Sequence, residues 1–346
     1  MTEYPYISVV IPCFNEEKFI SSLLSNLMEQ DYPKDKVEII LADGNSTDNT
    51  KSIIEKMGQT ISYVKCIDNP DRFVSPGLNA AIKMSTGEVV VRMDAHSIYP
   101  SNYWTVLVEK LFLHKADNVG GVWITMRGAD TIEARAIVLA SSHPLGIGNA
   151  RYRLGASDDV EVDTVPYGCF RRDVFERIGF FDTDLHRNQD DEFNGRIKKN
   201  GGKIVLVPTI EIKYFARENF DKLSTMFYQY GLYKPLVNLK LGAPATMRQF
   251  APPMLVMSLT LLLLAGFFLS LAAVLFWMEC VVYFLAITAV SMKIAGLKER
   301  KLLLYTMATF PVIHFSFGLG YIFGWMKFTI LRRHHHADFG AIKTNR

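Results

Sequence analysis

The chain has 346 residues, a formal net charge of +3 and a hydrophobic fraction of 49%. So small a net charge produces no global basic field, which excludes nucleic-acid binding driven by overall charge. The length leaves room for about two domains. The long apolar runs are confined to the C-terminal part of the chain, and what precedes them has the composition of an ordinary soluble domain.

The cysteines and the N-terminus indicate a reduced, cytoplasmic setting. Cys13, Cys66, Cys169 and Cys280 are scattered without a Cys-x-x-Cys pair, so neither a zinc site nor a disulfide framework is indicated. The first residues lack a basic segment followed by an apolar one, so we expect no signal peptide. The soluble part of the protein is therefore expected on the cytoplasmic side of a membrane.

The first hundred or so residues alternate short apolar runs with segments of helical spacing. The predicted strands are Ile7–Ile11, Val37–Ala42, Ile61–Cys66 and Glu88–Met93, and the helices between them lie around Phe19–Met28, before Met57 and over Pro76–Ser85. Alternation at this spacing indicates βαβ units, hence an α/β fold with a mostly parallel sheet and helices on both faces.

Polar residues follow three of these strands. They are Asn15 and Glu16 after the first strand, Asp43 after the second, and Asp94 and His96 after the fourth. Ligands of such sheets bind beyond the carboxyl ends of the strands. We therefore expect these side chains to gather at one edge of the sheet. The alternative for Asp43 is a purely local role in a turn or helix cap.

The middle of the chain is less regular. We expect a strand over Val119–Met126, a helix over Thr131–Ser142, a polar loop over Arg151–Val162, a helix over Gln189–Asn200 and a short strand over Lys203–Val207.

Three apolar runs near the C-terminus are Pro252–Trp277, Cys280–Leu297 and Leu302–Leu331. The first exceeds the roughly 20 residues that span a bilayer. The alternative is a buried helical domain, but such long uncharged runs are rare in soluble proteins. Three spans would place the basic loop after Leu297 and the tail at Arg332–Arg333 on opposite sides. Two spans with a broken or re-entrant third segment would place both in the cytoplasm, and we favour this version.

A series of short blocks runs along the chain in a distinctive order. They are Val9–Glu16, Asp43–Thr50, Asn79 with Gly87, Asp94–His96, Gly168–Arg172, Gly179–Asp182, and Gln189–Phe193 with Arg196. Together these blocks resemble family 2 glycosyltransferases of GT-A fold, especially membrane-associated enzymes of succinoglycan-type exopolysaccharide assembly, and the resemblance covers about residues 7–240. The three residues His334–His336 resemble a short metal-binding tract, which we interpret as part of a basic, membrane-flanking tail.

This resemblance implies a binding site for a nucleotide-diphosphate sugar. The residues it assigns to the donor are Pro12, Asn15, Glu16, Asp43, Asn79 and Asp94. It also implies a divalent cation, because the charge of the leaving diphosphate grows as the glycosyl bond breaks. Asp94 is the expected ligand. Most relatives carry a second Asp where this chain has His96, which leaves Mn²⁺ and Mg²⁺ both open. Alternatively, His96 is a loop histidine bonded to backbone.

The resemblance places the catalytic base at the start of a helix, in a Glu-Asp pair that aligns with Gln189-Asp190. Asp190 is therefore the expected base, Asp191 the second candidate and Glu192 a weaker third. Replacement of the family's Glu by Gln189 removes one charge, which should leave Asp190 easier to ionise. The alternative is that these acids merely favour a helix N-terminus.

The segment before the apolar runs carries Arg217, Gln229 and Lys234, which we assign to the acceptor and diphosphate side. The Gln-x-x-Arg-Trp block of processive synthases is absent here, which favours transfer of a single sugar. We therefore predict a catalytic GT-A domain over 1–213, interfacial or acceptor-side helices over 214–249, two or three transmembrane helices over 250–331 and a basic cytoplasmic tail over 332–346.

Together these features predict a multi-pass protein of the cell membrane with a cytoplasmic catalytic domain. It would be an inverting glycosyltransferase of polysaccharide or glycoconjugate biosynthesis that moves one hexose-type sugar to a lipid-linked acceptor. That acceptor would be a polyprenyl phosphate or a polyprenyl-diphosphate saccharide. The alternatives are a processive polysaccharide synthase and a catalytically silent membrane protein that binds nucleotide sugar.

Overall fold

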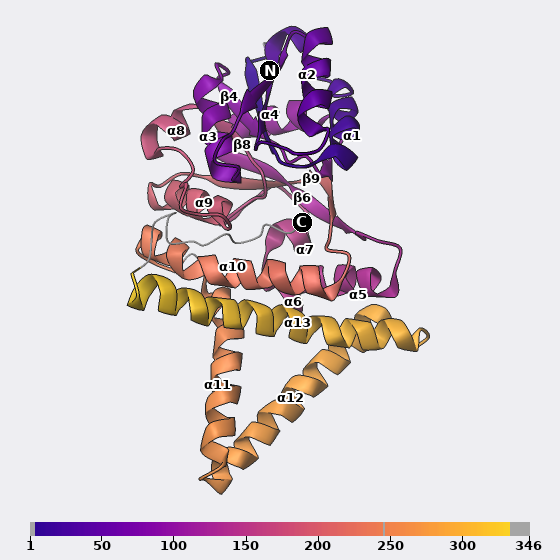
Figure 1. Cartoon of the computed structure of the whole chain (residues 1–346), viewed down its shortest axis with the longest axis vertical. Helices are drawn as coiled ribbons and strands as arrows, with labels where there is room; N and C mark the ends of the chain where they lie inside the picture. Colours follow the sequence, from indigo (N-terminus) through magenta and orange to yellow (C-terminus); the bar gives the residue numbers. More distant parts are fainter. Residues whose placement is uncertain (1–3, 245, 333–346) are drawn as a thin grey trace. The chain divides into compact units, whose positions relative to one another are not determined.

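The computed structural model of the chain describes residues 4–244 and 246–332 (Figure 1). The expected tail, including its histidine tract, therefore lies outside the described residues except for Arg332. The chain divides into two units. The first unit is Met1–Ile124 with Arg151–Tyr214, and the second is Thr125–Ala150 with Phe215–Arg346.

The first unit contains a sheet and its covering helices. Its strands are β1 (Ile7–Cys13), β2 (Val37–Asp43), β3 (Val64–Asp68), β4 (Val89–Arg92), β5 (Ser97–Ile98), β6 (Asn118–Met126), β7 (Val160–Glu161), β8 (Cys169–Arg171) and β9 (Ile204–Phe215), the ends of β6 and β9 reaching into the second unit. Its helices are α1 (Glu17–Met28), η1 (Lys34–Lys36), α2 (Thr50–Thr60), α3 (Val74–Met84), α4 (Tyr103–Leu113), α7 (Arg151–Leu154), α8 (Asp173–Ile178) and α9 (Gln189–Lys199).

The sheet runs in the order β3-β2-β1-β4-β8-β6-β9-β5, and β7 pairs with β9. Strands β1 to β4 pair with one another in parallel, as the alternating pattern predicted. The pairs β4–β8, β6–β8, β5–β9 and β7–β9 are antiparallel. The sheet is thus mixed, because the less regular half of the domain adds antiparallel strands beside the parallel ones.

Helices cover both faces of the sheet (Figure 1). Along β1, Ile7, Val9 and Ile11 pack into one apolar cluster with residues of α1 and α4, whereas Val10 packs into the other with residues of α3, α8 and α9. Alternate residues of a strand point to opposite faces, so a strand that is apolar throughout needs cover on both. The carboxyl end of β1 is therefore held beside that of β2, where Cys13 lies opposite Asp43.

Some local predictions were incomplete. The sequence reading did not identify α4, whose Trp104 and Leu107 are fully buried. The segment expected as a polar loop at Arg151–Val162 includes the short elements α7 and β7. The strand expected at Lys203–Val207 continues as β9 to Phe215, since its buried residues go on alternating with more exposed ones beyond Val207.

The second unit is helical apart from the strand ends. It contains α5 (Ile132–Ser141), α6 (Pro144–Ile147), α10 (Phe220–Leu241), η2 (Met247–Phe250), α11 (Ala251–Gly266), α12 (Ser270–Ala295), α13 (Arg300–Trp325) and a π-helical turn over Met326–Ile330. Three of its helical segments are long and apolar enough to cross a membrane: Met247–Gly266, Ser270–Ala295 and Arg300–Ile330.

The apolar run Pro252–Trp277 was expected to form one helix and instead forms parts of two. Helix α11 ends at Gly266, and α12 begins at Ser270. At Gly266, an added Cβ would lie 3.1 Å from the Cα of Ala273, so the absence of a side chain lets the two helices turn closely. Length and composition alone could not locate this turn, because the residues Phe267 to Leu269 within it are themselves apolar.

Helices α10 and α13 lie side by side along much of their length (Figure 1). Added Cβ atoms at Gly231, Gly320 and Gly324 would come within 2.1 to 2.2 Å of carbonyl oxygens on the facing helix. The two backbones therefore approach each other through these glycines. Ser224 and Ser316 add a hydroxyl–hydroxyl contact of 2.8 Å in the same seam.

At the opposite end of the parallel strands from their carboxyl ends, a buried glutamate joins three segments of the first unit. Glu38 Oε1 accepts hydrogen bonds from the Ser8 hydroxyl at 2.9 Å and from the Thr86 backbone N–H at 2.6 Å. Burial alone would raise the pKa of Glu38, but these hydrogen bonds outweigh it and hold that pKa below its ordinary value. The carboxylate is thus favoured in the folded state.

We predict that Glu38→Gln destabilises the protein by about 1–3 kcal/mol at neutral pH, since charge-assisted hydrogen bonds are lost in a buried place. A depressed folded-state pKa contributes stability above the unfolded pKa, and this contribution is lost as pH falls through the folded one. The difference between variant and wild type should therefore shrink below about pH 4. Thermal melts from pH 3 to 8 measure it. Glu55→Gln, at an exposed glutamate, is the matched control. An equal effect of both variants would contradict the prediction.

Candidate active site

The loops that follow β1 and β2 are bonded to each other. The backbone N–H of Asn15 donates to the Ser46 hydroxyl at 2.9 Å, and the Thr47 N–H donates to Asn15 Oδ1 at 2.8 Å. Asn15 and Asn45 have φ angles of 53° and 57°, in the left-handed region that asparagine tolerates better than most residues. The sequence therefore builds one rigid rim from two separate loops.

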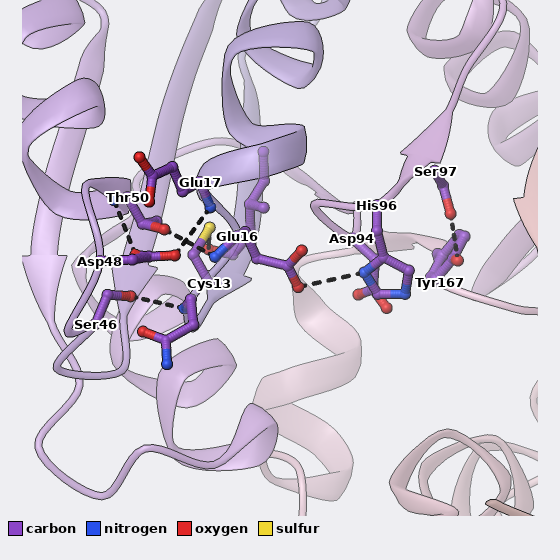
Figure 2. A network of polar contacts seen from close by, with 12 residues as sticks. Cys13, Glu16, Glu17, Ser46, Asp48, Thr50, Asp94, His96, Ser97 and Tyr167 are labelled. Carbon is purple, nitrogen blue, oxygen red and sulfur yellow. Dashed lines mark hydrogen bonds and ion pairs between the residues drawn. The ribbon is translucent and has the colours of Figure 1, made fainter. Parts of the chain in front are cut away.

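The start of α1 and the loop before α2 continue this network. The Glu16 N–H donates to Thr50 Oγ1 at 2.8 Å, and Asp48 accepts from the backbone N–H groups of Glu17 and Thr50 at 3.2 and 3.0 Å (Figure 2). Burial would raise the pKa of Asp48, but the hydrogen bonds from Thr50 outweigh it and the pKa is lowered. Asp48 thus acts as an ionised cap that holds the two loops together.

Asp43 ends β2 at the carboxyl edge of the sheet, as predicted. Its side chain is fully buried, and Oδ2 accepts from the Ser46 N–H at 3.0 Å. The other oxygen, Oδ1, has no hydrogen-bond partner among the described residues. A buried carboxylate oxygen without a donor is costly, so a ligand N–H at this edge would be stabilising. The sequence prediction that Asp43 accepts from a nucleotide base remains a prediction.

Two other residues assigned to the donor have structural neighbours. Pro12 lies in β1 opposite Ala42 of β2. The Asn79 side chain on α3 donates to the Phe181 carbonyl at 2.8 Å and accepts from the Phe181 N–H at 3.0 Å. Asn79 thereby anchors the segment that leads to α9, and its contact with a donor sugar stays a prediction.

Tyrosines frame the short segment that carries Asp94 and His96. The Asp94 N–H donates to the Tyr99 hydroxyl at 2.7 Å. The Ser97 and Tyr167 hydroxyls lie 2.7 Å apart (Figure 2). Burial raises the pKa of Tyr99 and of Tyr167 well above the ordinary value, so both phenols stay neutral. The segment from Asp94 to Ser97 is therefore held in place by uncharged tyrosine hydroxyls.

The Glu16 carboxylate extends toward His96 (Figure 2). His96 Nδ1 lies 3.4 Å from Glu16 Oε1. Within the described residues no group of three or more His, Cys, Asp or Glu side chains could hold a metal ion by itself. Cations such as Mg²⁺ are commonly held by one or two carboxylates together with substrate phosphates. Asp94, with His96 beside it, fits such a partial ligand set.

Helix α9 begins immediately after a residue in an unusual conformation. Asn188, its N-cap, has a φ of 61°, and Gln189, Asp190 and Asp191 follow in the first turn. Glu192, the third candidate base, is buried and forms an ion pair at 2.6 Å with Arg196, which also donates to the Phe180 carbonyl at 2.7 Å. Glu192 is thus committed to holding α9 against the preceding segment.

Arg92 at the end of β4 connects the two parts of the site, and sequence reasoning did not identify it. It forms an ion pair with Asp190 and lies 3.3 Å from Asp94 through Nη2. Its side chain is only 3% exposed, against 28% for Asp190 and 16% for Asp94. One feature of the sequence could have identified Arg92: it is a charged residue that directly follows the apolar run Val89–Val91 in a strand that is buried throughout.

The remaining predicted residues, Arg217, Gln229 and Lys234, belong to the second unit. Gln229 and Lys234 are largely buried on α10. Their assignment to the acceptor stays a prediction.

Within the first unit, the site consists of two aspartates on either side of a buried arginine, a histidine, and the loops after β1 and β2, which are hydrogen-bonded to each other. Carboxylates are the side chains that commonly hold divalent cations together with phosphates and that accept protons in catalysis.

Comparison with known proteins identifies the family of this chain. The model of the family "Glycosyl transferase family 2" matches residues 8–179. The chain is 30% identical over 246 residues to the succinoglycan biosynthesis protein ExoA of Rhizobium meliloti, covering 70% of this chain and 73% of that protein. It is 32% identical over 241 residues to the dolichyl N-acetyl-alpha-D-glucosaminyl phosphate 3-beta-D-2,3-diacetamido-2,3-dideoxy-beta-D-glucuronosyltransferase of Methanococcus voltae, covering 67% of this chain and 74% of that protein.

A similar fold occurs in the mannosyltransferase PcManGT from Pyrobaculum calidifontis, solved in complex with GDP-Man and Mn²⁺. The TM-score is 0.59 at 21% sequence identity, covering 91% of this chain and 88% of that one. Similarity at this level of identity concerns the fold alone. Together with the family match and the two relatives, it shows that the chain belongs to glycosyltransferase family 2, as an enzyme of polysaccharide or glycoconjugate biosynthesis with a GT-A-like mixed sheet.

Proposed function

We propose that the enzyme transfers one sugar from a nucleoside-diphosphate sugar to a lipid-linked acceptor, with inversion at the anomeric carbon. The observation that carries this proposal is the link that Arg92 makes between Asp94 and Asp190. It brings the expected cation ligand and the expected base to one place. The similarity to a dolichyl-phosphate-linked glycosyltransferase and to a succinoglycan biosynthesis protein supports the class of acceptor and of product.

The donor would bind at the carboxyl edge of the sheet. The unpartnered Oδ1 of Asp43 suits an N–H of the nucleotide base, and Asn15 and Glu16 lie on the neighbouring loop. Since the two loops are already bonded to each other, little of their backbone needs ordering when the nucleotide arrives. This preorganisation supports a binding role for the rim as well as a structural one.

Asp94, with His96 beside it, would hold a divalent cation together with the diphosphate of the donor. When bound, that cation would neutralise charge on the departing nucleoside diphosphate. An imidazole next to a carboxylate suits Mn²⁺ better than Mg²⁺, which prefers oxygen ligands throughout. The complex of PcManGT with GDP-Man and Mn²⁺ supports the same class of cation.

Asp190 would take the proton of the acceptor hydroxyl. The hydroxyl oxygen then forms a bond to the anomeric carbon while the bond from that carbon to the diphosphate oxygen breaks. The electron pair leaves with the nucleoside diphosphate, and the proton remains on the Asp190 carboxyl group. Attack from the side opposite the leaving group inverts the anomeric configuration.

The acceptor would be presented by the C-terminal part of the chain. We propose that residues 1–213 form the catalytic domain and that residues 214–249, with Arg217, Gln229 and Lys234, contact the acceptor phosphate or diphosphate. Residues 250–331 would anchor the protein. Arginine and lysine are the side chains that bind phosphate groups most readily. The apolar helices of the second unit support an acceptor that is itself held in the membrane.

Within the anchor, we propose that α11 and α12 cross the membrane and that α13 does not. Helix α13 follows α10 closely through Gly231, Gly320 and Gly324, so both helices must lie at the same depth. Helix α10 carries Asp221, Lys222, Lys234 and Lys240, and charges at the bilayer centre are costly. Burial differs in the same sense: in the apolar 18-residue stretch of each helix, 44% of the residues are buried for α13 and 6% for α12.

For catalysis, we predict that Asp190→Asn lowers kcat about 10²- to 10⁴-fold, the range lost when a general base is removed. The assay uses purified full-length protein with a panel of nucleotide sugars and polyprenyl phosphate or diphosphate acceptors, and measures nucleotide release and lipid product. Product length separates one transfer from many. Asp191→Asn is the matched control, one position along the same helix turn. If Asp191→Asn were the inactive variant, the base would be Asp191.

For the cation, we predict that Mn²⁺ stabilises the wild-type protein in the presence of UDP or GDP and that Asp94→Asn removes this effect. His96→Asp should retain it but shift the preference from Mn²⁺ toward Mg²⁺, because an oxygen donor replaces nitrogen. Thermal shift with each ion measures both changes. His114→Gln, at a histidine paired with Asp159, is the control and should behave as wild type. Unchanged ion preference in His96→Asp would remove His96 from the proposed ligands.

For the topology, we predict that a membrane-impermeant thiol reagent labels Phe268→Cys in intact cells. The same reagent should reach Lys298→Cys and Arg332→Cys only after permeabilisation. The first position lies in the turn between α11 and α12, and the others flank α13. The wild-type chain, with its native cysteines, gives the background. External labelling of Arg332→Cys would mean that α13 crosses the membrane as a third span.

A further inference from the structure

The charges at the end of β4 are arranged around a buried arginine. Arg92 is 3% exposed and lies between two carboxylates that are far apart in sequence, Asp94 and Asp190. Its Cζ atom also lies 5.8 Å from the ring centre of Tyr167 and 5.9 Å from that of Phe181. A guanidinium taken out of water requires such negative partners, because its desolvation is otherwise uncompensated.

The two carboxylates divide the guanidinium between them. Nη1 contacts Asp190, Nη2 contacts Asp94, and the remaining Nε is buried with no hydrogen-bond partner among the described residues. The planar fork of arginine can hold two carboxylates in fixed relative positions. Arg92 therefore sets where Asp190 lies relative to Asp94.

We infer that Arg92 is a positioning residue that couples cation binding at Asp94 to the placement of Asp190. This inference rests on the proposed function, which puts the cation at Asp94 and the base at Asp190. Without cation, the guanidinium supplies positive charge to Asp94. A divalent cation that binds Asp94 must share that carboxylate with Arg92 and is repelled by its charge. When the cation is bound, the hydrogen bond of Arg92 to Asp94 weakens and its contact with Asp190 is retained.

Two consequences have opposite signs. Removal of the Arg92 charge leaves Asp94 and Asp190 without their shared counter-ion, so a cation should bind more tightly. The same removal leaves Asp190 without a fixed orientation, so the chemical step should slow while donor binding is retained. A purely structural role of Arg92 would weaken cation binding and activity together.

Lysine separates the charge from the geometry. Arg92→Lys keeps a positive charge, but an ammonium cannot present the planar fork that reaches both carboxylates. It should therefore restore the weaker, wild-type-like cation affinity without restoring kcat. Asp190→Asn gives the reverse test, because it removes one negative charge and leaves Arg92 to Asp94 alone. Cation binding to that variant should be weaker than to the wild type.

The experiment measures Mn²⁺ affinity by calorimetry on the purified full-length protein, with the metal alone and with UDP or GDP present. We expect Arg92→Met to bind Mn²⁺ about tenfold more tightly than the wild type, as one repulsive charge is lost. Its kcat should fall about 100-fold with little change in donor KM. The matched control is Arg177→Met, since Arg177 also pairs with two aspartates of the first unit, Asp117 and Asp173.

Three outcomes would overturn the inference. Suppose that the wild type binds Mn²⁺, that Arg92→Met binds it equally or more weakly, and that Asp190→Asn has the wild-type affinity. In that case Arg92 does not compete with the cation. If Arg92→Lys recovers kcat, the fork is not what positions Asp190. If the wild type binds neither Mn²⁺ nor Mg²⁺ with either nucleotide, the inference fails together with the proposed cation site. Should Arg92→Met not fold, the Arg92→Lys and Asp190→Asn affinities still decide the question.

Discussion

A buried guanidinium at the end of β4 is the constraint on which the rest of the site depends. Arg92 is placed where helices cover both faces of the strand, so it cannot reach water and must be matched by carboxylates. Asp94 is close because it follows two residues after the end of the strand. Asp190 comes from the first turn of α9, which lies far along the chain. The ion pair with Asp190 thus joins the start of α9 to the carboxyl end of β4.

The rim formed by the loops after β1 and β2 is held differently, by hydrogen bonds from backbone N–H groups to side-chain oxygens. Asn15 accepts a hydrogen bond from one residue of the next loop and donates its N–H to another, and it adopts a positive φ to do so. Positive φ recurs at Asn188, just before Asp190. Strained or rare backbone conformations persist only where the surroundings over-determine them. Here they occur where chains must turn sharply to aim polar side chains at one edge of the sheet.

The parallel half of the fold was predictable because its pattern is local. The run Val9–Val10–Ile11 is apolar on both faces, and the residues that end each strand are polar, so sheet, cover and edge follow from periodicity. The nearness of Asp94 and Asp190 was expected only through the family resemblance, since nothing local joins them. Arg92 was missed because an arginine after three valines reads equally as a strand end in solvent. Its partners are visible only in three dimensions.

The C-terminal region shows the same division between composition and tertiary contact. Hydropathy identified the apolar helices correctly but could place neither the turn at Gly266 nor the partner of α13. That partner is α10, and the glycines of the two helices let their backbones meet at distances that exclude any larger side chain. Glycine makes this close packing possible because it has no side chain to keep the backbones apart. The packing also ties an apolar helix to one that carries four charged residues, Asp221, Lys222, Lys234 and Lys240. The depth of α13 in a membrane therefore depends on its charged partner α10 as well as on its own hydropathy. Length and hydropathy therefore set only an upper bound on the number of spans.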